Sequence, residues 1–157
     1  MRPWSERPQI EATLLNPALF ATSLSVAARA YEQRAERLMI WPLAFLVPPL
    51  VLHRPTREAL PATIATHLPT WIGRQPLIRA GFPARAKQLT PLTREGLRLG
   101  LRTGVLSIDA GGVRGSLDVP DGDGDLVDVL KAAKFLGRWL PKVERPSSVF
   151  ALLGVRP

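Results

Sequence analysis

Three arginines spaced four residues apart form the pattern in this sequence that is best suited to binding. At about 100° per residue, a helix containing Arg94, Arg98 and Arg102 places them within an arc of about 80°. Guanidinium groups bind two oxygens at once, so such a stripe suits phosphates and carboxylates. Arg114, further along the chain, extends the same basic surface if the intervening segment folds back. These four arginines are our candidate residues for binding a nucleic acid or an acidic partner.

Three interpretations of the stripe remain open at this point. It could contact the phosphates of a nucleic acid, bind an acidic protein surface, or be a solvated helix face with no specific partner. The asparagine and glutamine side chains that often read base edges are missing from the segment. Their absence argues against a sequence-specific repressor.

Residue patterns that support catalysis or metal binding are lacking. There is no phosphate-binding Gly-Lys loop, no dinucleotide-binding glycine fingerprint and no cysteine. Both histidines are best explained as structural residues: His53 as the end of the apolar segment and His67 as part of a helix turn. An acidic loop begins at Asp121 like a calcium loop, but its twelfth position is Ala132 where a glutamate is needed. We therefore predict no enzyme activity, no cofactor and no metal site.

The arginine stripe needs a helix to carry it, and strong helix and hairpin signals surround it. Thr90 is a good capping residue and Pro91 suits the first helical position, which predicts a helix over residues 91–103 with Gly104 as its left-handed exit. Two strands over residues 105–109 and 113–117 should follow as a hairpin around a glycine-containing turn.

The rest of the chain is predicted to be mainly helical. Residues 39–52 (MIWPLAFLVPPLVL) are too short and too rich in proline to span a bilayer, which favours a buried core element. Within it we expect a helix from about Pro42 with a kink at Pro48-Pro49. Asn16-Pro17 predicts the start of a helix that runs to about Arg37. We predict further helices at about residues 56–60, 66–71, 75–88, with a break around Gly81 and Pro83, and 126–140, and a short strand at 149–155.

Short helices, a capped helix and a glycine-turned hairpin occur here in the order of a winged helix-turn-helix. We therefore predict an α+β, mostly α fold: a winged helix-turn-helix-like domain with a β-hairpin wing and flanking N- and C-terminal helices. The 157 residues suit one domain. Its expected parts are a flexible N-terminal arm (1–12), an N-terminal helical part (16–53), a winged-helix-like part (55–117), and a C-terminal helix and strand (125–157).

Composition indicates a globular protein, and its basic balance makes an acidic partner plausible. The net charge is +8 and the pI about 11.2, but a basic balance does not say which acidic partner is bound. We expect a cytoplasmic location, because the first residues lack an apolar stretch behind their charges and no segment suits a membrane. Trp4, Trp71, Phe82 and Trp139 would be binding hot spots if exposed, although large aromatic residues usually pack in the core.

Several strings, taken in order, resemble one family. From about Asn16 to Pro157 the chain is similar to the middle component of bacterial three-component ABC systems. The strings are NPALFATSL, PLAFLVPPLVLHRPTREALP, RAGFPARAKQLTPLTREGLRLGLRTGVLSID, KAAKFLGRWL and VFALLGVRP. LVLHRPTREALP and FALLGVRP are the most specific of them.

The resemblance implies a role within a larger assembly. An SMC-like ABC ATPase and a third subunit of the same system would be the partners, and such systems are thought to act against phages or plasmids. The chain would be a non-enzymatic adaptor that bridges these two partners. Contact with DNA and a homo-oligomer within the complex are both compatible with that role. The resemblance supplies no catalytic residues. The alternatives are a stand-alone winged-helix DNA-binding transcriptional regulator and, third, an enzyme of unrecognised type.

Overall fold

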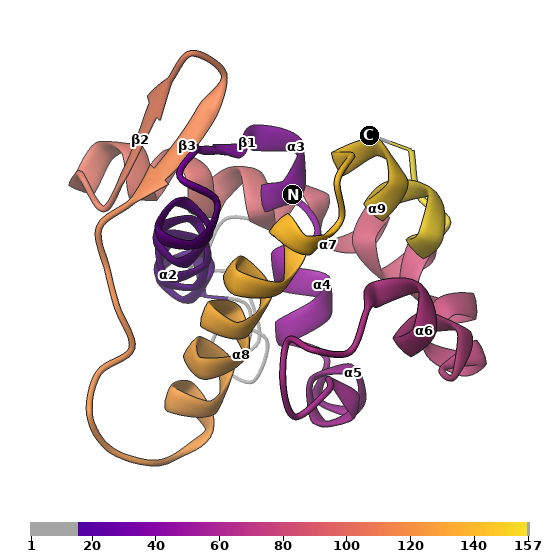
Figure 1. Cartoon of the computed structure of the whole chain (residues 1–157). Coiled ribbons are helices and arrows are strands. Elements are labelled where there is room, and N and C mark those ends of the chain that lie inside the picture. Colours follow the sequence, from indigo (N-terminus) through magenta and orange to yellow (C-terminus); the bar gives the residue numbers. More distant parts are fainter. Residues whose placement is uncertain (1–15, 157) are drawn as a thin grey trace.

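We analysed a computed structural model of the chain, which describes residues 16–156. Helices dominate, and one small antiparallel sheet lies at an edge of the molecule (Figure 1). The predicted α+β, mostly α class is confirmed at this level. The predicted N-terminal arm, residues 1–12 with Trp4, lies outside the described residues.

The elements follow one another in mostly short steps along the chain. The helices are α2 (Pro17–Ala35), α3 (Trp41–Ala44), α4 (Val47–Val51), α5 (Arg54–Ala59), α6 (Leu68–Gly73), α7 (Pro76–Thr103), α8 (Asp125–Trp139) and α9 (Pro146–Leu153), with a 3-10 turn, η2 (Leu140–Lys142), after α8. The strands are β1 (Met39–Ile40), β2 (Leu106–Asp109) and β3 (Gly112–Gly115).

Helix α2 forms the centre of the fold. It begins as predicted at Asn16, whose side-chain oxygen accepts a hydrogen bond of 2.8 Å from the Ala18 amide. Most of its residues are buried, and many of those are alanine or serine, so neighbouring backbones approach closely. Gly96 of α7 is one example, because a Cβ added there would lie 2.5 Å from the Cβ of Phe20. Glycines of α8 and β3 make similar approaches to α2.

The sheet has the strand order β1-β3-β2, and both pairings are antiparallel. The β2–β3 hairpin confirms the prediction. Its turn residues, Ala110 and Gly111, have φ angles of 48° and 79°, the left-handed pair required by a two-residue type I′ turn. Strand β1 was not predicted: residues 39 and 40 pair with β3 instead of continuing a helical segment.

Helix α7 corrects the prediction of two separate helices. It runs without interruption from Pro76 to Thr103 and contains Pro83 and Pro91 in its interior. Thr90 is therefore not a cap; its hydroxyl donates to the carbonyl of Ala86 within the helix, at 2.9 Å. Contacts of α7 with α2, α4, α6 and α9 hold the helix together where proline removes backbone hydrogen bonds. The predicted exit at Gly104, with a φ angle of 81°, is correct.

Two apolar segments also differ from prediction. Residues 39–52 form β1 and the two short helices α3 and α4, and not one helix kinked at its prolines. The predicted strand at 149–155 is wrong, since α9 covers most of it. Pro146 stands at the start of α9 and Gly154, with a φ angle of 74°, ends it. Short apolar runs do not distinguish a strand from a buried helix by their pattern alone, which explains the error.

Candidate partner-binding site

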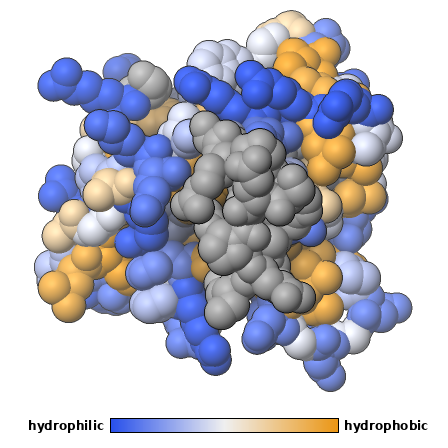
Figure 2. Space-filling view, turned by 180° about the vertical axis from the view of Figure 1, so that it is seen from behind, coloured by the Kyte–Doolittle hydropathy of each residue, from blue (hydrophilic) through white to orange (hydrophobic). Residues whose placement is uncertain are grey.

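The arginine stripe lies on the outer face of α7. Arg94, Arg98 and Arg102 are all exposed, whereas Gly96 and Gly100 of the same helix are buried against α2 and β2. Figure 2 views the molecule from the side on which α7 lies and shows hydrophilic side chains over much of that face, with hydrophobic patches between them. The three arginines therefore share the accessible side of the helix.

Arg114 behaves differently from the other three candidates. Its guanidinium lies 3.3 Å from a carboxylate oxygen of Glu32, so β3 is linked to α2 by an exposed ion pair. Arg94, Arg98 and Arg102 form no ion pair within residues 16–156. Of the four candidates, only Arg114 forms an ion pair within residues 16–156.

The three arginines of the stripe border two different surface features along α7. Arg98 and Arg102 border a shallow depression beside the first residues of α2, with Asn16 among its lining residues. Arg94 instead reaches the edge of a separate groove. The structure thus brings Arg98 and Arg102 together and assigns Arg94 to a different surface feature.

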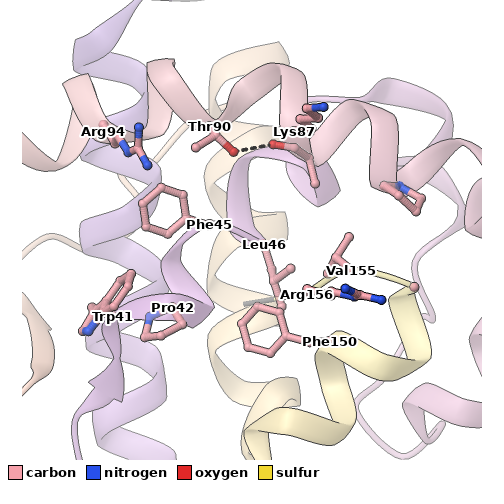
Figure 3. Close-up of a pocket in the computed structure, with 13 residues that line it drawn as sticks. Trp41, Pro42, Phe45, Leu46, Lys87, Thr90, Arg94, Phe150, Val155 and Arg156 are labelled. Carbon is pink, nitrogen blue, oxygen red and sulfur yellow. Dashed lines mark hydrogen bonds between the residues drawn. The ribbon is translucent and has the colours of Figure 1, made fainter.

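This groove lies between α3, α7 and α9 and has a volume of about 470 Å³ (Figure 3). Trp41 and Phe45 form one wall, with their rings edge to face at a centroid distance of 6.0 Å. Phe150 of α9 contributes to the lining from the opposite side. Trp41 is 53% exposed, which is unusual for so large an apolar side chain. The groove therefore presents an aromatic surface to the outside.

Positive charge surrounds the groove. Lys87, Arg94 and Arg156 are exposed and line it, and none of its lining residues carries a carboxylate. No ion pair within the described part of the chain involves these three cations. Thr90, also in the lining, directs its hydroxyl to the carbonyl of Ala86 (Figure 3). The groove thus combines an apolar lining with uncompensated cations.

Other basic residues have structural roles. Arg57 donates to the carbonyl of Val51 at 2.8 Å, beside the end of α4. Arg85 donates to the hydroxyl of Thr56 at 3.1 Å, and burial lowers the pKa of its guanidinium. His53 lies 2.7 Å from the same hydroxyl, and its pKa is lowered by burial and then by the charge of Arg85. These groups connect α4, α5 and α7, which fits the structural role predicted for His53.

Three of the four aromatic residues predicted as hot spots if exposed are core residues. Trp71, Phe82 and Trp139 are all buried. The indole N–H groups of Trp71 and Trp139 donate to the carbonyls of Ala59 and Thr66, at 2.7 and 2.6 Å. Sequence reasoning missed Trp41, because it lies in the segment predicted to be buried throughout. The short strand β1 and the turn into α3 carry it outward.

Residues 16–156 lack two other kinds of feature. No cluster of three or more histidine, aspartate or glutamate side chains there is placed to hold a metal ion. None of the helices in that range has the length and apolarity needed to cross a membrane.

Comparison with protein families gives a match over nearly the whole chain. The family model for Middle Component 3 of ABC-three component (ABC-3C) systems matches residues 4–157. The chain belongs to this family. Comparisons with curated proteins and with solved structures returned no significant match.

In this Middle Component 3 protein, the two most specific strings of the resemblance lie in different surroundings. LVLHRPTREALP, residues 50–61, contains His53, Thr56 and Arg57 and so supplies most of the polar network around α5. FALLGVRP begins at Phe150 in α9 and supplies Phe150, Val155 and Arg156 to the groove. One string therefore supports the fold, and the other forms part of the candidate site.

Proposed function

We propose that this chain is a non-enzymatic adaptor subunit that bridges an SMC-like ABC ATPase and a third subunit of an anti-phage or anti-plasmid ABC three-component complex. The observation that carries this proposal is the family match over residues 4–157, since a middle component belongs to a system of several components. The ATPase type, the bridging role and the defence role are parts of the proposal.

The surface of the protein supports a role in binding macromolecules. The outer face of α7 presents Arg94, Arg98 and Arg102 without ion pairs in the described residues, and an aromatic groove adjoins it. Arginine and exposed aromatic side chains are the residue types that most often dominate protein–protein binding energy. Positive charge on one face also speeds association with an acidic partner.

Co-expression with the neighbouring ABC ATPase and third component tests the adaptor proposal. We expect a stable ternary complex in which the ATPase and the third component fail to associate when the middle component is omitted. Nuclease treatment during purification shows whether the association is direct. If the ATPase and the third component bind each other equally well without this chain, it does not bridge them.

We further propose that α2 to β3 form a winged helix-turn-helix. The support is topological: a helix, a short strand, a helical segment ending in α7, and a hairpin follow in order, and the strands adopt the order β1-β3-β2. In such domains the helix before the hairpin can enter the DNA major groove. An experimental structure superposed on winged-helix domains over residues 17–115 checks this assignment.

The same topology favours a second candidate function, a stand-alone DNA-binding transcriptional regulator. Its test is binding of the isolated chain to duplex DNA, with fluorescence anisotropy as the measurement. A regulator binds one sequence far more tightly than unrelated DNA, by about a thousandfold or more at physiological salt. Equal, salt-sensitive binding to all sequences contradicts the regulator and leaves the adaptor with a non-specific DNA contact.

A further inference from the structure

We propose that the groove between α3, α7 and α9 binds an acidic segment of another protein of the same system, with a large apolar side chain of that segment seated against Trp41. This proposal rests on the adaptor function and names the surface through which one partner is held.

The lining of the groove determines the apolar part of the proposal. Trp41 is 53% exposed and is braced edge to face against Phe45, while Phe150 is 95% buried and belongs to the fixed core. An apolar side chain entering the groove would cover Trp41 without any need to move Phe150. Binding hot spots commonly form where an exposed aromatic side chain lies beside well-packed, buried apolar residues.

The cations bordering the groove determine the charge of the partner that it would bind. Lys87, Arg94 and Arg156 border the groove, no lining residue is acidic, and none of the three cations is ion-paired within residues 16–156. Three uncompensated cations repel a basic segment and favour carboxylates beside the apolar anchor. The phosphate backbone of a duplex would satisfy the cations but would leave Trp41 exposed, because its bases are already stacked on one another. The combination therefore favours an acidic protein segment.

The test compares groove variants with matched controls in the co-expressed complex. Trp41→Ala removes the aromatic wall, and its control is Leu77→Ala, which truncates a side chain that is 88% exposed and lies outside the groove. The pair Lys87→Glu and Arg94→Glu reverses the charge at the edge. Its control is the pair Arg74→Glu and Arg138→Glu, two exposed arginines elsewhere.

We expect Trp41→Ala and the groove charge reversal each to weaken the affinity for one partner subunit by about tenfold or more. The two controls should stay within about twofold of the wild-type affinity, since exposed residues outside an interface contribute little. Added salt should weaken the wild-type complex more than the charge-reversed one. Urea unfolding of every variant shows whether the fold is retained.

A photo-crosslinking amino acid, p-benzoylphenylalanine, gives a readout that does not depend on affinity. Placed at position 41, it should crosslink to a single partner subunit, and placed at position 77 it should not. Mass spectrometry of the crosslinked peptide should locate an acidic segment.

The outcomes separate this proposal from the adaptor function. If the wild-type complex forms and both groove variants bind with unchanged affinity, the groove proposal is overturned while the adaptor function stands. If the wild-type chain forms no complex, the adaptor function fails first. The groove proposal is also overturned if Trp41→Ala weakens only self-association of the isolated chain, or only its binding to duplex DNA.

Discussion

Helix α2 and the outer face of α7 differ in what surrounds their residues. Along α2, ten residues are buried, and glycines of α7, α8 and β3 pack directly on them. Along the outer face of α7, Arg94, Arg98 and Arg102 meet solvent, and Trp41 stands exposed at the nearby groove. Substitutions near α2 should therefore change stability, whereas substitutions on the outer face of α7 should change binding.

The largest effect is expected where α7 meets α2. Gly96→Ala places a Cβ 2.5 Å from the Cβ of Phe20, so the two helices must move apart. We expect a loss of about 2 kcal/mol in the free energy of unfolding, measured with urea.

The same substitution at Gly81 is a matched control within α7. Gly81 is exposed, and an added Cβ meets one guanidinium nitrogen of Arg85 at 3.3 Å, a contact that a shift of a few tenths of an ångström relieves. Alanine there should leave stability unchanged or raise it by up to about 1 kcal/mol, through its better helix propensity. Equal free energies of unfolding for Gly96→Ala and Gly81→Ala would contradict the distinction between the buried and the exposed side of α7.

The next effect concerns the hydrogen bonds that attach the hairpin to α2. The buried hydroxyl of Ser25 donates to the carbonyl of Val105 at 2.7 Å and accepts from the amides of Ser116 and Leu117, both at 3.0 Å. Ser25→Ala removes these bonds and should cost about 1 to 2 kcal/mol in urea unfolding. Thr22→Ala, which removes a hydroxyl bonded only within α2, should cost less. A larger loss for Thr22→Ala would argue against this role of Ser25.

Removing the arginine stripe should change stability little but should weaken binding. With Arg94, Arg98 and Arg102 all replaced by alanine, the free energy of unfolding should change by no more than about 0.5 kcal/mol per residue. Binding to an acidic partner should weaken. For a DNA partner, the plot of log affinity against log salt should flatten by about one unit per lost phosphate contact. Unchanged binding would identify the stripe as solvated surface.

The smallest effect is a dependence of stability on acid pH through Asp118. Its carboxylate accepts from Lys134 at 2.9 Å and from the Val119 amide at 2.7 Å, and lies 3.1 Å from Arg29 of α2. These contacts lower its pKa below the usual 3.8, with the Lys134 hydrogen bond as the largest cause. The folded state therefore binds this proton less readily than the unfolded state. The resulting stability is present above about pH 5 and is lost as pH falls through the lowered pKa.

Urea unfolding of the wild type and of Asp118→Asn across this range measures the effect. The wild type should lose more stability than the variant between about pH 5 and pH 2. The difference between them should shrink at high salt, because the ion pairs of Asp118 with Lys134 and Arg29 are exposed to solvent. Parallel pH profiles would contradict the assignment.

The ends of helices and the hairpin turn could be predicted from the sequence, because short-range residue patterns determine them. Asn16-Pro17 marked the start of α2, Gly104 the end of α7, and Ala110-Gly111 the hairpin turn. Each works through backbone geometry or a hydrogen bond within a few residues. The four-residue spacing of Arg94, Arg98 and Arg102 likewise predicted that they share one face of a helix, which is the outer face of α7.

Features that depend on distant contacts could not be predicted in this way. Pro91 is an ordinary first helical residue by local rules, but α7 continues through it in a helix that packs on α2, α4, α6 and α9. Strand β1 exists because β3, far along the chain, pairs with it. The groove joins Trp41, Arg94 and Phe150 from three separate segments, so no spacing in the sequence could reveal it.

The continuity of α7 has a geometric consequence. At a rise of about 1.5 Å per residue, Lys87 at the groove and Arg102 near the helix end are about 22 Å apart along the axis. The helix continues through Pro91 between them, so two ligands held at these places would stand about that far apart. A subunit built in this way would act as a spacer, setting how far apart its partners stand.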